Sequence, residues 1–269
     1  MKNNNRQLGR ILSRREALGL FRVAGTAIFL LGCTPRKSSS ALAQSSVAVA
    51  ASSTANLATL PACIVRPEQT EGPYFVDEKL NRSDIRSDPS DGSVKEGVPL
   101  KLTLRVSGIS GTGCTPLAGA IVDIWHCDAL GVYSDVTDRS FNTVGKKFLR
   151  GYQVTDANGI VEFTTIYPGW YPGRTVHIHF KVRTDATSGQ RYEFTSQLYF
   201  DDSISDRVYT QAPYASKGQR TQNNAEDGIF KDGGDQLLLK LTKNGQGYAA
   251  TFDVGLQMAS ETPRLKAGA

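Results

Sequence analysis

Two of the three histidines in this chain, His177 and His179, are separated by a single residue in the stretch TVHIHFKV. Side chains alternate between the two faces of a β-strand, so both imidazoles would project to one side of a strand, with Ile178 behind them. Two imidazoles at this spacing could bind one metal ion. The pattern H-x-H alone is a weak signal, because two polar strand residues that face solvent have the same spacing.

The residues before the histidine pair strengthen the metal interpretation. Tyr171 lies on a segment broken by Pro168-Gly169 and Pro172-Gly173, which lets the chain turn back toward the imidazoles. Arg174 adds a permanent positive charge close by. No Asp or Glu lies in this stretch, so a ferrous site built from two histidines and one carboxylate is not apparent.

Phenolate oxygens together with two imidazoles would favour ferric iron. A tyrosine ionises near pH 10 in water, about three units above neutrality, but a bound trivalent cation can displace its proton at neutral pH. A second tyrosine is available in Tyr133, which follows the apolar stretch IVDIWHC across a short loop. Spacing alone leaves two alternatives open: Tyr133 as a packing residue, and a copper or zinc site built on His126, His177 and His179.

The elements that must position these residues are short strands. Apolar or alternating stretches of strand length recur from about residue 64, at 99–106, 120–127, 151–154, 159–166, 177–182, 193–200, 235–241 and 248–254. Asn244-Gly245 between the last two is a strong hairpin signal. With no sustained helical periodicity beyond the first 45 residues, the pattern predicts an all-β sandwich of immunoglobulin or transthyretin type. Residues 128–150 and 201–235 are predicted to be long surface loops.

The first 45 residues have the character of an export signal. They hold eight basic residues and one acidic residue, which leaves 23 basic and 25 acidic residues in the rest of the chain. The basic character of the whole chain therefore gives no support for nucleic-acid binding. Ser13-Arg14-Arg15-Glu16 resembles the twin-arginine pattern, and the apolar run that follows is short and interrupted by Arg22, which makes it a poor membrane span.

We therefore predict an exported protein, periplasmic or extracellular. Cleavage before Cys33, in a lipobox, would leave a membrane-anchored lipoprotein, whereas cleavage after Ala43 would not. Residues 46–63 are predicted to be a flexible Ser/Ala-rich tether, 64–258 a β-sandwich domain, and 259–269 a C-terminal tail. An oxidising compartment would allow one disulfide among Cys63, Cys114 and Cys127, and the sequence does not choose the pairing; three buried thiols are the alternative.

Several ordered motifs resemble those of the intradiol ring-cleaving dioxygenases, in particular the catalytic domain of the protocatechuate 3,4-dioxygenase type. They cover about residues 64–256 and comprise EQTEGPYF (68–75), WHCDALGVY (125–133), RG (150–151), TD (155–156), PGWYP (168–172), Arg174, HIH (177–179), TSQLYF (195–200) and RTQNNAEDGIF (220–230). The resemblance implies one non-haem ferric ion per chain. Its implied ligands are Tyr133, Tyr171, His177 and His179.

The resemblance also implies an oxidoreductase that opens a catechol-type diol with both atoms of O2, giving a cis,cis-muconate-type diacid. Tyr171 would take up a proton of the diol, Arg174 would stabilise negative charge on the ring, and Gln197 would orient that arginine or line the pocket. Tyr74 and His126 are candidates for the pocket wall. Tyr74 would suit a plain turn equally well, and the alternative for His126 is a packing role.

The predicted partners are the diol and O2, and no nucleic acid is expected. A membrane would be contacted only through a lipid on Cys33. A homo-oligomer is allowed. The alternative function is a secreted transthyretin-like module that binds a metal or ligand without ring cleavage. A sandwich fold hosts both functions, so the fold does not discriminate between them. The tyrosine pair together with Arg174 does discriminate between the two functions, because a binding module does not need these three residues.

Overall fold

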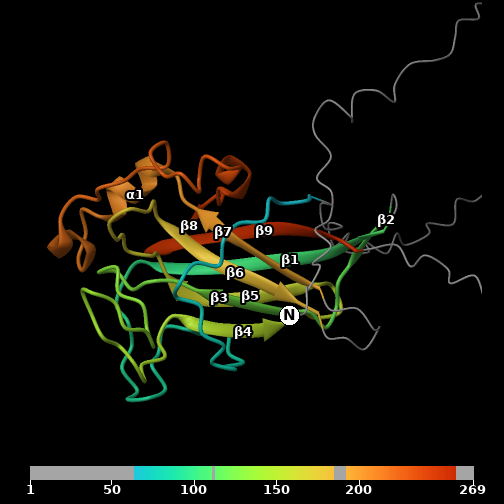
Figure 1. Ribbon diagram of the computed structural model, residues 1–269, viewed down its shortest axis with the longest axis horizontal. Coiled ribbons are helices and arrows are strands. Elements are labelled where there is room, and N and C mark those ends of the chain that lie inside the picture. The colour runs from blue at the N-terminus through green and yellow to red at the C-terminus, as the bar shows by residue number, and fades with distance from the viewer. Residues whose placement is uncertain (1–63, 111–112, 185–191, 259–269) are drawn as a thin grey trace, which may run out of the picture. The chain divides into compact units, whose positions relative to one another are not determined.

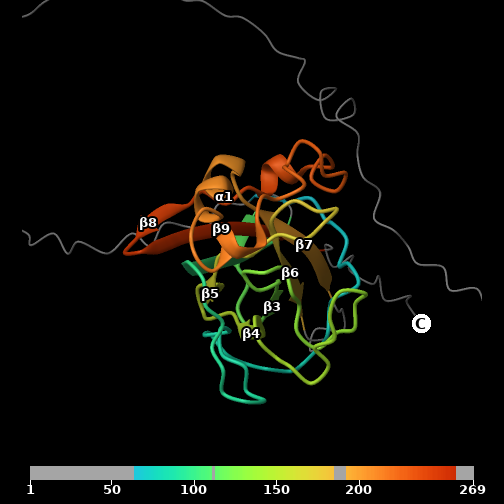
Figure 2. The same cartoon turned by 90° about the vertical axis from the view of Figure 1, so that its left-hand side faces the viewer.

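Two β-sheets pack face to face in the computed structural model of the chain (Figure 1). Figure 2 shows β8 and β9 on the left and β6 and β7 on the right. The first sheet has the order β2 (Gly113–Pro116), β1 (Pro99–Ser110), β9 (Gly247–Gln257) and β8 (Thr242–Asn244), and β5 (Ile160–Ile166) also pairs with β1. The second has the order β4 (Arg150–Val154), β3 (Ile121–Trp125), β6 (His177–Arg183) and β7 (Glu193–Tyr199). The predicted all-β sandwich is confirmed.

The structure describes residues 64–110, 113–184 and 192–258. The predicted export signal, tether and C-terminal tail lie outside these ranges and stay predictions. Within these ranges, no helix is long and apolar enough to cross a membrane.

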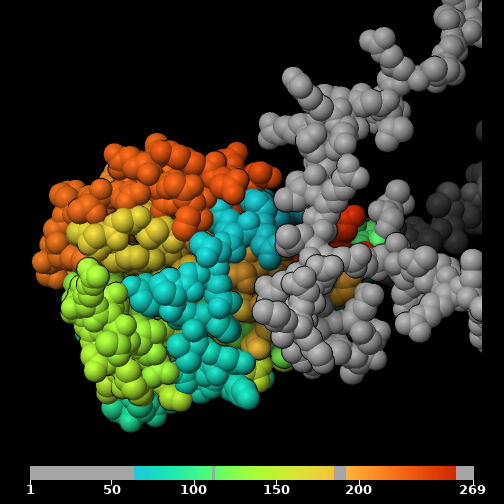
Figure 3. All heavy atoms as spheres, viewed as in Figure 1, coloured from blue at the N-terminus to red at the C-terminus, as the bar shows by residue number. Residues whose placement is uncertain are grey.

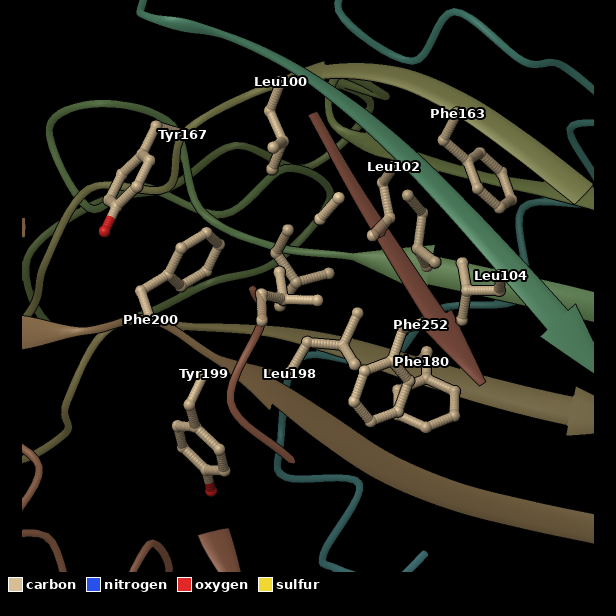
Figure 4. Packing of buried hydrophobic residues seen from close by; sticks show 14 of the residues in the cluster. Leu100, Leu102, Leu104, Phe163, Tyr167, Phe180, Leu198, Tyr199, Phe200 and Phe252 are labelled. Carbon is tan, nitrogen blue, oxygen red and sulfur yellow. The ribbon is translucent and has the colours of Figure 1, made fainter. Parts of the chain in front are cut away.

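Alternation along the strands decides which side chains enter the core. Leu100, Leu102 and Leu104 on β1 are buried, and Phe252 on β9 lies 6.2 Å from Phe180 on β6, measured between ring centroids (Figure 4). Ile178 and Val182 on β6 belong to the same core cluster as Phe180. The odd-numbered residues of β6 therefore project from the opposite face of the second sheet, and this face carries the candidate site.

The loop prediction is confirmed for 128–149, which contain no strand or helix, and is wrong in part for 201–235. This second segment contains α1 (Asp202–Val208) and the 3₁₀ helix η3 (Tyr214–Lys217). Asp201 caps α1 by accepting hydrogen bonds from the backbone N–H groups of Ser203 and Ile204. Two turns of helix are too short for an apolar periodicity to stand out in the sequence.

The strand predicted at 235–241 is wrong. Gly234–Leu237 form a 3₁₀ helix, η4, and regular pairing begins only at β8, which is joined to β9 by a turn containing Gly245. Leu237 and Leu239 are buried in the core, and this burial accounts for the apolar pattern of the segment. A short buried apolar run does not distinguish a strand from an irregular segment.

The structure shows whether two of the cysteines are disulfide-bonded or free. Cys114 on β2 is disulfide-bonded, and Cys127 is a buried free thiol whose Sγ lies 3.4 Å from the Gly169 carbonyl oxygen. Cys127 is therefore excluded from the disulfide, while Cys63 lies outside the described residues. The predicted export to an oxidising compartment stays a prediction.

Candidate active site

His177 and His179 project from the same face of β6, as their spacing predicts. His177 pairs across the sheet with Tyr199 on β7, and His179 pairs with Gln197 on β7 and with Trp125 on β3. The Trp125 indole stacks on the His179 imidazole with ring centroids 4.9 Å apart and planes 5° apart. The cross-strand neighbours thus fix the orientation of both imidazoles.

The two imidazoles point their Nε2 atoms at each other, 3.0 Å apart. The Thr175 carbonyl oxygen lies 2.7 Å from Nδ1 of His177, which places a proton on Nδ1 and leaves the Nε2 lone pair free. Burial lowers the pKa of His177 to about 3, and burial beside His177 lowers the pKa of His179 as well. Both imidazoles are therefore neutral at pH 7.

Two phenols complete the cluster. The Tyr171 hydroxyl lies 3.2 Å from His177 Nε2, and the Tyr133 ring meets the Tyr171 ring edge-on at 5.7 Å. The Tyr133 hydroxyl is buried beside Tyr171 but makes no hydrogen bond of normal geometry with the described residues. Burial raises the pKa of both phenols, so only a nearby cation would ionise them at neutral pH.

This donor set fits a metal ion. Nitrogen atoms 3.0 Å apart can bind one ion, because metal–imidazole bonds are about 2.0–2.1 Å long. In the described part of the chain, no three His, Cys, Asp or Glu side chains are grouped to hold a metal. The two phenols beside the imidazoles offer further donors, and hard phenolate oxygens suit ferric iron. The structure brings together the four predicted ligands.

Arg174 is fixed beside this cluster by two polar partners. Its Nε donates to Asp227 Oδ2 at 2.8 Å, and its Nη2 donates to Gln197 Oε1 at 2.6 Å. Burial opposes its charge, but Tyr171 and Asp227 together raise the pKa of Arg174 above its ordinary value. The guanidinium is therefore a permanent, oriented positive charge, and the predicted contact between Gln197 and Arg174 is present.

Asp227 is a functional residue that sequence reasoning missed. Its side chain is 1% exposed, and besides Arg174 it accepts hydrogen bonds from the backbone N–H groups of Thr175, Ile229 and Phe230. Four donors hold the pKa of this carboxyl below its usual range despite its burial. Its only sequence signal is its position in RTQNNAEDGIF, and the family resemblance implies no role for this acid.

Residues 68–75, called here the covering arm, lie over the exposed side of the site. Figure 3 shows this part of the chain in cyan beside the light-green loop that follows β3. A Cβ at Gly72 would lie 3.4 Å from His179 Cε1, so the arm passes directly over this imidazole. The Tyr74 ring stacks on Tyr133 at 4.5 Å, and its hydroxyl donates to Asp138 at 2.8 Å. The arm thereby shields the histidines from water.

A cavity of about 540 Å³ opens next to the tyrosines. Tyr74, Tyr133 and Tyr171 line it together with residues of the 130–141 loop, Pro172 and Lys217. Tyr74 thus lies in the cavity wall, as one of its two predicted roles requires. Because Tyr133 and Tyr171 both line the cavity, a bound molecule would meet both phenols.

His126 does not line this cavity. It is fully buried, with Nε2 2.7 Å from Thr165 Oγ1 and Nδ1 2.8 Å from the Cys127 carbonyl oxygen. Burial lowers its pKa to about 4, so it is a neutral packing residue whose nitrogens are already used. The three-histidine copper or zinc site is therefore wrong, because His126 projects from the opposite face to Trp125 and His179.

Comparisons with known proteins agree with this geometry. Residues 70–222 match the family model described as Dioxygenase. The protocatechuate 3,4-dioxygenase beta chain of Burkholderia cepacia is 29% identical over 185 residues, which cover 65% of this chain and 73% of that protein. Catechol 1,2-dioxygenase 1 of Acinetobacter lwoffii is 28% identical over 196 residues, which cover 62% of this chain but only 58% of that protein.

Among solved structures, an intradiol ring-cleavage dioxygenase from Tetranychus urticae shares the fold with a TM-score of 0.61. It is 32% identical in sequence, and the match covers 72% of this chain and 95% of that chain. The similarity therefore extends over nearly the whole of that structure.

Proposed function

Because this chain belongs to the intradiol ring-cleaving dioxygenases, we propose that it uses one non-haem ferric ion to cleave a catechol-type diol with O2 to a cis,cis-muconate-type diacid. The observation that carries the proposal is the convergence of two neutral imidazoles and two phenols beside a cavity, with no carboxylate among them. The names of the two curated relatives, a protocatechuate and a catechol dioxygenase, support a catechol-type substrate.

Bound ferric iron would supply the chemistry of the site by drawing electron density from the diol ring, which makes the ring carbons reactive toward O2. Tyr133, Tyr171, His177 and His179 would hold it. Tyr171 lies between the cavity and His177, so its phenolate oxygen is placed to accept a proton from a diol hydroxyl.

The other residues of the site stabilise charge on the ring and exclude water. Arg174 holds a fixed positive charge where negative charge develops on the ring, and its two buried partners prevent it from turning toward solvent. Trp125 and the covering arm exclude water from the imidazoles. A protein that only stored a metal would have no use for a buried, doubly anchored guanidinium, which is why the ligand-binding alternative is less favoured.

The proposal is tested on the iron-loaded protein. We expect one ferric ion per chain, a wine-red colour from phenolate-to-iron charge transfer, and diacid products that carry both atoms of isotopically labelled oxygen. Catechol, protocatechuate and hydroxyquinol are offered separately, and products are identified by mass and ultraviolet spectrum. A semialdehyde product, or no oxygen uptake with any of the three, would contradict ring cleavage between the hydroxyls.

Lys217 is expected to favour diols that carry a carboxylate. Its ammonium lies in the cavity wall, donates to the Leu130 carbonyl oxygen and sits 4.8 Å from the Trp170 ring centroid, with no carboxylate ion-paired to it among the described residues. Because a half-exposed ion pair contributes about 0.2–1 kcal/mol, Lys217→Met should raise KM for protocatechuate by roughly 1.5- to 5-fold. KM for catechol should stay unchanged, and Lys217→Arg is the control. Equal changes in KM for both substrates would show that the Lys217 ammonium does not recognise the substrate carboxylate.

A further inference from the structure

Behind Arg174 lies a buried row of polar side chains, Gln197, Tyr199 and Gln69, of which the mechanism above assigns a role only to Gln197. The Tyr199 hydroxyl donates to Gln69 Oε1 at 2.7 Å and lies 3.0 Å from Gln197 Oε1, which in turn accepts from Arg174 Nη2 at 2.6 Å. Tyr199 and Gln197 are 0% exposed and Gln69 is 9% exposed. The row joins the covering arm, strand β7 and the segment before β6, so it connects parts of the chain that are distant in sequence.

The NH2 group of each glutamine in this row fixes the orientation of its amide. Gln197 Nε2 donates to the Thr70 carbonyl oxygen at 2.9 Å, which turns Oε1 toward Arg174. Gln69 Nε2 donates to the carbonyl oxygens of Ile229 and Asp232, at 3.0 and 3.1 Å, which turns its Oε1 toward Tyr199. Neither amide can flip without breaking buried hydrogen bonds, and an unpaired buried polar group costs about 1–3 kcal/mol.

The single proton of the Tyr199 hydroxyl can go to only one of its two acceptors. The contact with Gln69 is the shorter one, so the proton is directed to Gln69 and the Gln197 oxygen remains available to the guanidinium. Arg174 is then held by Asp227 and by Gln197, and the Tyr199 hydroxyl, whose proton lies toward Gln69, accepts a further hydrogen bond from the guanidinium.

We propose that Tyr199 and Gln69 are positioning residues that fix the rotation of the Arg174 guanidinium: Gln69 orients the Tyr199 hydroxyl, and this hydroxyl accepts from the guanidinium, so that its remaining N–H groups face the reacting ring. Tyr199 does not line the cavity and is fully buried, so it acts through the other residues and not on the substrate. The role in turnover rests on the proposed function, whereas the fixed rotation of the guanidinium does not.

The test compares Tyr199→Phe with a matched control. Phenylalanine keeps the ring that packs edge-on against Phe230 at 5.0 Å and removes only the hydroxyl. Tyr167→Phe is the control, because Tyr167 is equally buried and its hydroxyl contacts Ser205 at 2.7 Å in a different part of the core. Gln69→Leu is a second variant that removes the acceptor of the Tyr199 proton.

The first readout is independent of catalysis. In nitrogen-15 NMR of the full chain, the guanidinium signals of Arg174, assigned by their loss in Arg174→Lys, report rotation about the Cζ–Nε bond. We expect slow rotation in wild type and in Tyr167→Phe, and several-fold faster rotation in Tyr199→Phe and Gln69→Leu. Equal rotation rates in wild type and Tyr199→Phe would overturn the proposal, whether or not the protein cleaves any diol.

The second readout is turnover of the iron-loaded protein. Because a buried hydrogen bond contributes about 0.5–1.5 kcal/mol, Tyr199→Phe should lower kcat by roughly 2- to 13-fold with unchanged KM and iron content. Tyr167→Phe should leave kcat unchanged. In an Arg174→Lys background the effect of Tyr199→Phe should disappear, because the group that it positions is absent. An unchanged kcat in Tyr199→Phe, or a full additional loss in the double variant, would overturn the role in turnover.

Discussion

Replacing either His177 or His179 with alanine should abolish iron binding, whereas Ile178→Val should bind iron as wild type does. Both Nε2 atoms point at the same place, 3.0 Å apart, while the Ile178 side chain is fully buried in the core on the other face of β6. Removing a residue that only supports a ligand typically costs 10- to 100-fold in metal affinity, so removing a ligand should cost more than about 100-fold.

Iron content per chain and the charge-transfer absorption are the measurements for these three variants. Ile178→Val also controls for damage to the core, since shortening a buried isoleucine costs about 0.5–1.5 kcal/mol in the free energy of unfolding. Circular dichroism and thermal unfolding establish that the alanine variants are folded. Equal iron retention in all three variants would show that the metal is held elsewhere.

The placement of the histidines could be predicted because it follows from a local rule. Alternation along β6 requires only that residues 177–183 form a strand, and that strand is present. The same rule separated His126 from Trp125, and the structure shows His126 bonded to Thr165 inside the core. Where a prediction depended on alternation within one strand, sequence alone was sufficient.

The support of Arg174 could not be predicted in the same way. Asp227 is 53 positions from Arg174 in sequence, and Gln69 is 130 positions from Tyr199. Such contacts depend on how the covering arm and the segment after α1 pack against the sheet, and no local periodicity encodes that packing. The resemblance named motifs in both segments, but a motif alone does not say which of its residues meet across the fold.

Arg174→Lys should keep iron and substrate affinity and lose turnover, with kcat lower by a factor on the order of 10² or more. Lysine retains the charge but carries its three N–H donors on a single nitrogen, so it cannot reproduce the planar spacing with which Arg174 bonds Asp227 and Gln197 and faces the ring. The fold should tolerate the change, because three backbone N–H groups still satisfy Asp227. The loss should fall in kcat, since the ring acquires its negative charge only during the reaction.

Arg183→Lys provides the matched control for this prediction. Arg183 also projects from the second sheet and is bound by both oxygens of a carboxylate, with its Nε and Nη2 each 3.0 Å from Asp123, but it lies at the opposite end of β6 from His177. Losing this pairing should leave kcat unchanged. If Arg174→Lys turned over within a few-fold of wild type, charge alone would suffice. If it lost its iron, the arginine would belong to the metal site and not to the activation of the ring.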